Sequence, residues 1–136
     1  MTHRRSRYHD GVYEVDADAF STMVLDALDA IPDRYRERMH NVDIQVEEWA
    51  QPDDYRRTAT PRGSTLLGVY RGIPLTRRGA YYNLAAPDTI VIFSGPLQRL
   101  ARDAADLEAR VGRVVRHEVA HYFGISDERL HEIDAY

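Results

Sequence analysis

Apolar residues recur at two different spacings along this chain, and the change from one spacing to the other restricts the fold more than any other feature. One helical face is indicated by four apolar residues that lie three or four positions apart: Phe20, Val24, Leu28 and Ile31. Asp16 precedes them as a helix cap. Pro32 follows them, and because the residue before a proline disfavours helical backbone angles, we expect the helix to end near Ala30 or Ile31.

Strand spacing follows this helix. Val42, Ile44 and Val46 alternate with polar residues, which is the period of a half-buried strand. Residues 65–70 (TLLGVY) and 89–93 (TIVIF) are two further strand candidates. Together these segments predict a small sheet of three or four strands.

The remaining segments complete an α+β layout. Residues 51–63 are polar and contain two prolines, so we expect a long surface loop there. The chain turns helical again after Pro96, and residues 104–123 keep apolar side chains at helical spacing until Gly124 ends the helix. The order of helix, strands and two helices is typical of the α+β class.

Length and composition indicate an ordinary globular domain. A chain of 136 residues is too short for two useful cores, so we expect one domain over residues 14–136 after a flexible tail over residues 1–13. The net charge of -4 argues against general nucleic-acid affinity. No segment approaches the roughly 20 apolar residues of a membrane helix, and no apolar stretch of a secretory signal follows the N-terminus. We therefore expect a cytoplasmic protein without membrane or nucleic-acid partners.

The second long helix carries the residues with chemical potential. His117-Glu118-Val119-Ala120-His121 has the HExxH pattern, and residues four apart on a helix share one face. Both imidazoles can therefore reach one tetrahedral ion at about 2.1 Å, and with no cysteine in the chain a metal has only histidine and carboxylate ligands. Glu118 is placed to take a proton from a zinc-bound water, whose pKa falls toward roughly 7.

A catalytic zinc needs a third protein ligand, and the sequence after His121 offers several. The pattern continues as HExxHxxGxxD, in which Gly124 breaks the helix and Asp127 is brought back toward the metal. The competing candidates are His131, Glu132 and Asp134, and His131 could also orient a ligand from outside the coordination sphere. Asp127 is the ligand that we prefer.

These residues give the chain a resemblance to a known family. Residues 117–132 (HEVAHYFGISDERLHE), 68–76 (GVYRGIPLT) and 87–93 (PDTIVIF) resemble the bacterial zincin-like metallopeptidases with a minimal zincin fold. The resemblance implies a small mixed sheet packed on an N-terminal helix and a C-terminal active-site helix. It also implies a zinc-dependent peptidase that acts on a peptide or protein, with zinc on His117, His121 and Asp127 and with Glu118 as the catalytic glutamate.

The extension xxGxxD also resembles that of the metzincins, with one departure. Metzincins place a methionine turn beneath the metal after the motif, whereas Met1, Met23 and Met39 all precede it here. Only 15 residues follow His121, so we expect no metzincin C-terminal subdomain and weak or very specific proteolysis.

Residues outside the motif could complete a substrate site. In zincins the substrate backbone pairs with an exposed sheet edge, and residues 89–93 are the candidate edge, although their continuous apolar character equally suits a central strand. A tyrosine hydroxyl near the metal could stabilise the oxyanion of the tetrahedral intermediate, and the candidates are Tyr81, Tyr82 and Tyr122.

Two other functions remain open from the sequence. The chain could be a non-catalytic metal-binding or protein-interaction domain that keeps the zinc site for stability. Alternatively, it could be a regulatory partner protein that docks elsewhere through Arg56 and Arg57 of the segment 51–63.

Overall fold

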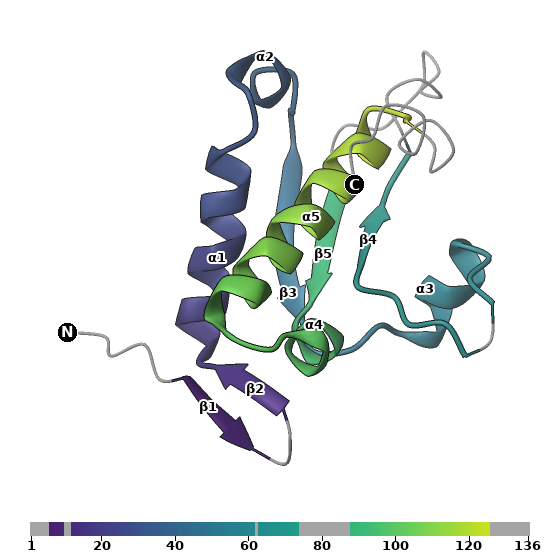
Figure 1. The fold of residues 1–136 in the computed structure, drawn as a ribbon. Coiled ribbons are helices and arrows are strands. Elements are labelled where there is room, and N and C mark those ends of the chain that lie inside the picture. Colours follow the sequence, from purple (N-terminus) through teal and green to yellow (C-terminus); the bar gives the residue numbers. More distant parts are fainter. Residues whose placement is uncertain (1–5, 10–11, 62, 74–87, 126–136) are drawn as a thin grey trace.

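A computed structural model describes residues 6–9, 12–61, 63–73 and 88–125 of the chain (Figure 1). The described elements, in chain order, are β1 (Ser6–His9), β2 (Val12–Val15), α1 (Ala17–Asp29), α2 (Asp33–Arg36), β3 (Val42–Glu47), α3 (Pro52–Arg57), β4 (Gly68–Arg71), β5 (Asp88–Phe93), α4 (Ser94–Leu100) and α5 (Ala104–Tyr122). The α+β class expected from the sequence is therefore confirmed. No helix among these elements is long and apolar enough to cross a membrane.

The main sheet has three strands in the order β3-β5-β4. Strand β3 runs parallel to β5, with Val42 opposite Asp88, and β4 runs antiparallel to β5, with Gly68 opposite Ile92. The sheet is therefore mixed, as expected. In the described part of the chain the edges are β3 and β4. The sequence left open whether residues 89–93 form a substrate edge or a central strand, and the structure shows that β5 is central. Its central place explains its unbroken apolar run, because Ile90–Phe93 are fully buried.

Helices α1 and α5 cover one face of this sheet (Figure 1). Helix α1 begins where the sequence predicts, because Oδ1 of Asp16 accepts a hydrogen bond of 2.7 Å from the backbone N–H of Ala19. It ends at Asp29, with Ala30 as its C-cap, as the following proline requires. The core between the helices and the sheet is built mainly from buried aliphatic and aromatic side chains, among them Phe20, Val24, Ile90, Ile92, Leu97, Leu107, Val111 and Val115.

Helix α3 replaces part of the long loop expected over residues 51–63. Pro52 supplies its first turn, and the carboxylate of Asp54 accepts the backbone N–H of Gln51 at 2.9 Å. Asp54 is only 2% exposed and binds the guanidinium of Arg71 in β4 through two hydrogen bonds of 2.8 Å. This contact between distant residues fixes α3 beside β4, and no local pattern in the polar segment reveals it.

Residues 6–9 and 12–13 of the flexible tail expected over residues 1–13 lie in strands. Strands β1 and β2 form an antiparallel hairpin in which Ser6 lies opposite Val15. The hairpin is attached to the domain because Oε1 of Gln98 in α4 accepts the N–H of Val15 at 2.8 Å, and the side chain of Tyr13 joins the core. Alternation over only four residues per strand is too short to stand out in the sequence.

Candidate metal centre

Helix α5 positions the motif at its C-terminal end, beside β4 (Figure 1). The helix begins where the carboxylate of Asp103 accepts the N–H of Asp106 at 2.8 Å, and it ends at Tyr122. Its apolar face is buried against α1 and the sheet. Because this packing fixes the rotation of the helix, the last two turns place His117, Glu118 and His121 on the side that faces β4.

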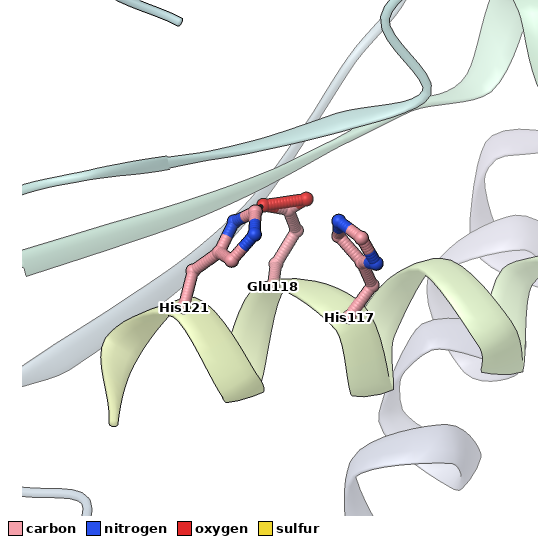
Figure 2. A group of neighbouring side chains, drawn as sticks. All are labelled: His117, Glu118 and His121. Carbon is pink, nitrogen blue, oxygen red and sulfur yellow. Dashed lines mark hydrogen bonds and ion pairs between the residues drawn. The ribbon is translucent and has the colours of Figure 1, made fainter. Parts of the chain in front are cut away.

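These three side chains converge (Figure 2). Each offers one nitrogen or oxygen atom, and the three atoms lie within 4.8 Å of one another. The imidazole rings of His117 and His121 have their centroids 4.5 Å apart and are inclined by 70°, and the carboxylate of Glu118 lies beside them (Figure 2). The spacing of four residues thus brings the two rings to one site, as the sequence predicts.

Glu118 is the innermost member of this cluster. It is 4% exposed, and its Oε1 lies 3.0 Å from Nδ1 of His121, whose side chain is 30% exposed. An ionised carboxylate only accepts hydrogen bonds, so Nδ1 is the nitrogen that donates in this contact. In a neutral ring Nε2 is then unprotonated, and an unprotonated nitrogen is what a metal requires.

Gly68 lets strand β4 lie close against this part of α5. A Cβ atom at this position would be 2.6 Å from Cγ1 of Val114 and 3.3 Å from Cγ of Glu118. The absence of a side chain therefore sets the separation between the strand and the carboxylate. Sequence reasoning missed this role, although a glycine inside a strand candidate is a recognised sign of a close approach.

Two cavities meet at His117 and Glu118. One of about 260 Å³ extends along α5 toward Arg113 and Val114. The other, of about 350 Å³, extends past His121 and is also lined by Arg57 at the end of α3. Both are bordered by Leu66 and Gly68, at the start of β4. The cluster therefore lies on the wall of a groove between the edge strand and the helix.

Six of the candidate site residues lie outside the described residues: Tyr81, Tyr82, Asp127, His131, Glu132 and Asp134. The turn that leads toward Asp127 is described. Gly124 has φ of 79°, its N–H donates to the carbonyl of His121 at 2.9 Å, and the N–H of Ile125 donates to that of Ala120 at 3.0 Å. These are the two hydrogen bonds of a Schellman motif, which confirms the predicted end of the helix at Gly124.

Tyr122 does not face the cluster of His117, Glu118 and His121. It is fully buried, its hydroxyl donates to the carbonyl of Arg38 at 3.3 Å, and the same oxygen accepts the N–H of His40 at 3.3 Å. One residue after His121 is a rotation of about 100° around the helix, which turns Tyr122 to the core side. This geometry does not support the oxyanion role considered for Tyr122.

The donor set fits a zinc ion. Two imidazole nitrogens from one helical face are typical zinc ligands, and the nearby carboxylate suits a hydrolytic site. A third protein ligand would leave a position for water in tetrahedral coordination. The chemistry of the residues is thus consistent with the zinc cofactor expected from the sequence.

Comparisons with known proteins agree with this site. No curated protein matches the chain. A conserved hypothetical protein from Thermus thermophilus shares the fold, with a TM-score of 0.55 and 21% identity over 80% of this chain and 94% of that one. The zincin-like metallopeptidase family matches residues 39–136, which include the motif and the whole three-stranded sheet. The chain therefore belongs to the zincin-like metallopeptidase family.

Proposed function

We propose that this protein is a zinc-dependent peptidase that hydrolyses a peptide or amide bond with Glu118 as general base. The observation that carries the proposal is the buried carboxylate of Glu118 beside two imidazoles, on the wall of a groove. A carboxylate at this place can reach both the metal ligands and a molecule in the groove. An arrangement used only for stability has no need of the groove.

His117 and His121 would hold the zinc ion, with Asp127 as the proposed third ligand. His131 is the alternative, either as a ligand or as a residue that orients one. When bound, zinc supplies a Lewis acid that lowers the pKa of a coordinated water toward roughly 7 and polarises a carbonyl. The two histidines are already on one face of α5, so little chain entropy is lost when they bind.

Glu118 would move the proton during hydrolysis. Its carboxylate accepts a proton from the attacking water and returns it to the nitrogen of the leaving amine. Because Glu118 is 4% exposed, bulk water does not compete strongly for its oxygens. Its hydrogen bond with His121 also holds that ring in place before substrate arrives.

The substrate that we propose is an extended peptide or protein segment. The sheet edge beside the cluster is β4, since Gly68, Val69 and Tyr70 border the same cavity as His121. An extended backbone can add to such an edge through main-chain hydrogen bonds. Peptide substrates and a cytoplasmic location stay predictions.

Replacing Glu118 with Gln tests the proposal. We expect the variant to bind zinc with the stoichiometry of the natural protein and to lose at least about 100-fold in hydrolysis of a peptide pool, because an amide cannot accept the proton. Glu108→Gln, on the exposed side of the same helix, is the matched control and should retain activity. Mass spectrometry of the pool and metal analysis measure the two properties.

The alternative is a metal-binding or interaction domain without catalysis. The hydrogen bond between Glu118 and His121 favours it, because a carboxylate that orients a zinc ligand is a common structural device. In that case the natural protein would bind zinc and cleave no peptide, and Glu118→Gln would change only metal affinity.

A further inference from the structure

We propose, building on the peptidase function above, that the groove selects peptides with acidic side chains on both sides of the scissile bond, which Arg113 and Arg57 recognise. These two arginines come from different elements. Arg113 belongs to α5, and Arg57 is the last residue of α3.

The cavities place one arginine on each side of the candidate centre. Arg113 lies one helical turn before His117 and lines the cavity of about 260 Å³, whereas Arg57 lines the cavity of about 350 Å³. His117 and Glu118 line both cavities. A peptide that places its scissile carbonyl at these residues therefore extends into both cavities.

Neither arginine is neutralised by an ion pair with another described residue. Arg56, next to Arg57, pairs with Asp53, and Arg110, one turn before Arg113, pairs with Asp106. The charge of Arg57 helps to lower the pKa of Asp54, so the two side chains interact electrostatically. Both oxygens of that carboxylate, however, already accept hydrogen bonds from Arg71. Both arginines are exposed and can turn toward a ligand.

The described residues that line the groove carry a charge opposite to that of the whole protein. Among the described residues that line the two cavities, Glu118 is the only carboxylate, whereas the chain as a whole has a net charge of -4. Guanidinium groups bind carboxylates in a planar, two-pronged geometry. An acidic peptide is thus attracted to the groove and repelled by most of the remaining surface.

The apolar lining of the cavity beside Arg113 indicates which residues of the peptide lie next to the scissile bond. Leu66, Leu67 and Val114 line the same cavity as Arg113. These side chains favour an apolar residue beside the scissile bond. The acidic residues would then follow further out along the peptide on each side.

Cleavage of matched peptides tests the preference. The peptides share an apolar pair at the scissile bond and carry Glu, Gln or Lys at the flanking positions on one side or the other. We expect kcat/KM to fall about two- to fivefold when Glu is replaced with Gln on either side, which is the range for exposed ion pairs. Arg113→Gln should abolish the preference on one side only, and Arg57→Gln that on the other side.

Two neighbouring arginines provide controls. Arg56→Gln alters α3 beside Arg57, and Arg116→Gln alters α5 beside the motif, but neither residue lines either cavity. Both variants should keep the preference for Glu. A loss of preference in these controls equal to that in Arg57→Gln and Arg113→Gln would overturn the assignment, because a diffuse positive field would then explain it.

A binding measurement separates this inference from the proposed activity. Fluorescein-labelled peptides with Glu or Gln flanks are titrated into zinc-loaded Glu118→Gln protein, and anisotropy gives Kd. We expect the Glu peptide to bind about four- to 25-fold more tightly, since two pairs contribute, and each arginine variant to lose about two- to fivefold. Equal affinities, or no measurable binding of either peptide, overturn the inference. Tight, selective binding without cleavage by the natural protein would contradict only the peptidase function.

Discussion

Oε1 of Glu118 lies 3.0 Å from Nδ1 of His121, nearly one turn further along α5. The contact fixes Nδ1 as the donor, so Nε2 is the nitrogen that His121 presents to a metal. A single residue can therefore orient a zinc ligand in the resting protein and accept a proton during hydrolysis. Under the proposed function, the two roles would use the same buried carboxylate at different stages.

Replacing either histidine should abolish tight metal binding. Replacing a residue that hydrogen-bonds to a zinc ligand already lowers zinc affinity by about 10- to 100-fold. We therefore expect His117→Ala and His121→Ala, which remove a ligand itself, each to weaken zinc binding by at least about 100-fold. Competition with a chromogenic chelator measures this affinity. The control is His40→Ala, because His40 is exposed and only its backbone N–H is bonded to Tyr122. Unchanged affinity in His117→Ala would contradict the assignment of the site.

The third ligand can be identified in the same way. If Asp127 completes the site, Asp127→Ala should weaken zinc binding by about as much as a histidine variant, whereas His131→Ala should cost at most about 10- to 100-fold as a supporting residue. The reverse order of the two losses would assign the ligand to His131. Each variant needs only the chelator titration and a circular dichroism spectrum to confirm that it folds.

The buried carboxylate of Asp54, which Arg71 binds, should contribute strongly to the stability of the fold. Asp54 is 2% exposed and Arg71 binds it through two hydrogen bonds, so Asp54→Asn leaves a partly buried guanidinium underpaired. Losing one partner of a fully buried pair costs about 3–5 kcal/mol, and because the side chain of Arg71 is 24% exposed we expect about 1–3 kcal/mol here. Urea unfolding measures the loss. The adjacent exposed pair gives the control: Asp53→Asn should cost less than about 0.5 kcal/mol.

Because of the same carboxylate, we expect part of the unfolding free energy to be lost at acidic pH. Its hydrogen bonds from Arg71 hold the pKa of Asp54 below its ordinary value, and they outweigh the opposite effect of burial. A lowered pKa in the folded state gives stability that is complete above the unfolded value of about 3.9 and is lost as the pH falls through the folded value. The difference in unfolding free energy between natural protein and Asp54→Asn should be constant from about pH 7 to pH 5 and decrease below about pH 4. A difference that grows on acidification would contradict this origin.

Gly68 should be intolerant of even one methyl group. In Gly68→Ala the new Cβ would lie 2.6 Å from Cγ1 of Val114, so β4 or α5 must shift, at a cost of about 1–3 kcal/mol. Activity should fall as well, because Glu118 borders the same contact. Adding Val114→Ala should relieve the overlap, so the two losses of unfolding free energy should be less than additive. Strict additivity would show that the methyl group is accommodated elsewhere.

The sequence predicts those features that depend on neighbours along the chain. Spacings of three or four residues predict the cap at Asp16, the helix that it begins and the two histidines on one face of α5. The short helix α3 does not, because it is held by Arg71, which is 17 residues from Asp54. Local patterns do not contain such partners.

The order of the strands in the sheet is a second feature that the sequence does not predict. The largely apolar run of residues 89–93 is compatible with an edge strand or with a central strand, and only the pairing of this strand with both β3 and β4 decides between them. This choice determines which edge can accept a substrate. The strand beside His117, Glu118 and His121 is β4. Its glycine, Gly68, controls the distance between β4 and Glu118, and this role can be recognised only once the packing of α5 is known.

The turn after α5 should govern both stability and metal affinity. Gly124 has φ of 79°, in the left-handed region, and its Schellman hydrogen bonds end the helix three residues before Asp127 in the sequence. Gly124→Ala should therefore destabilise the protein by about 1–2 kcal/mol, whereas Gly124→Asn should cost less, because asparagine adopts this conformation more readily than alanine. If Asp127 is a ligand, zinc affinity should follow the same order: highest in the natural protein, lower in Gly124→Asn and lowest in Gly124→Ala. Thermal unfolding with and without zinc measures both effects, and a metal-induced stabilisation that is equal in all three proteins would show that the turn does not position a ligand.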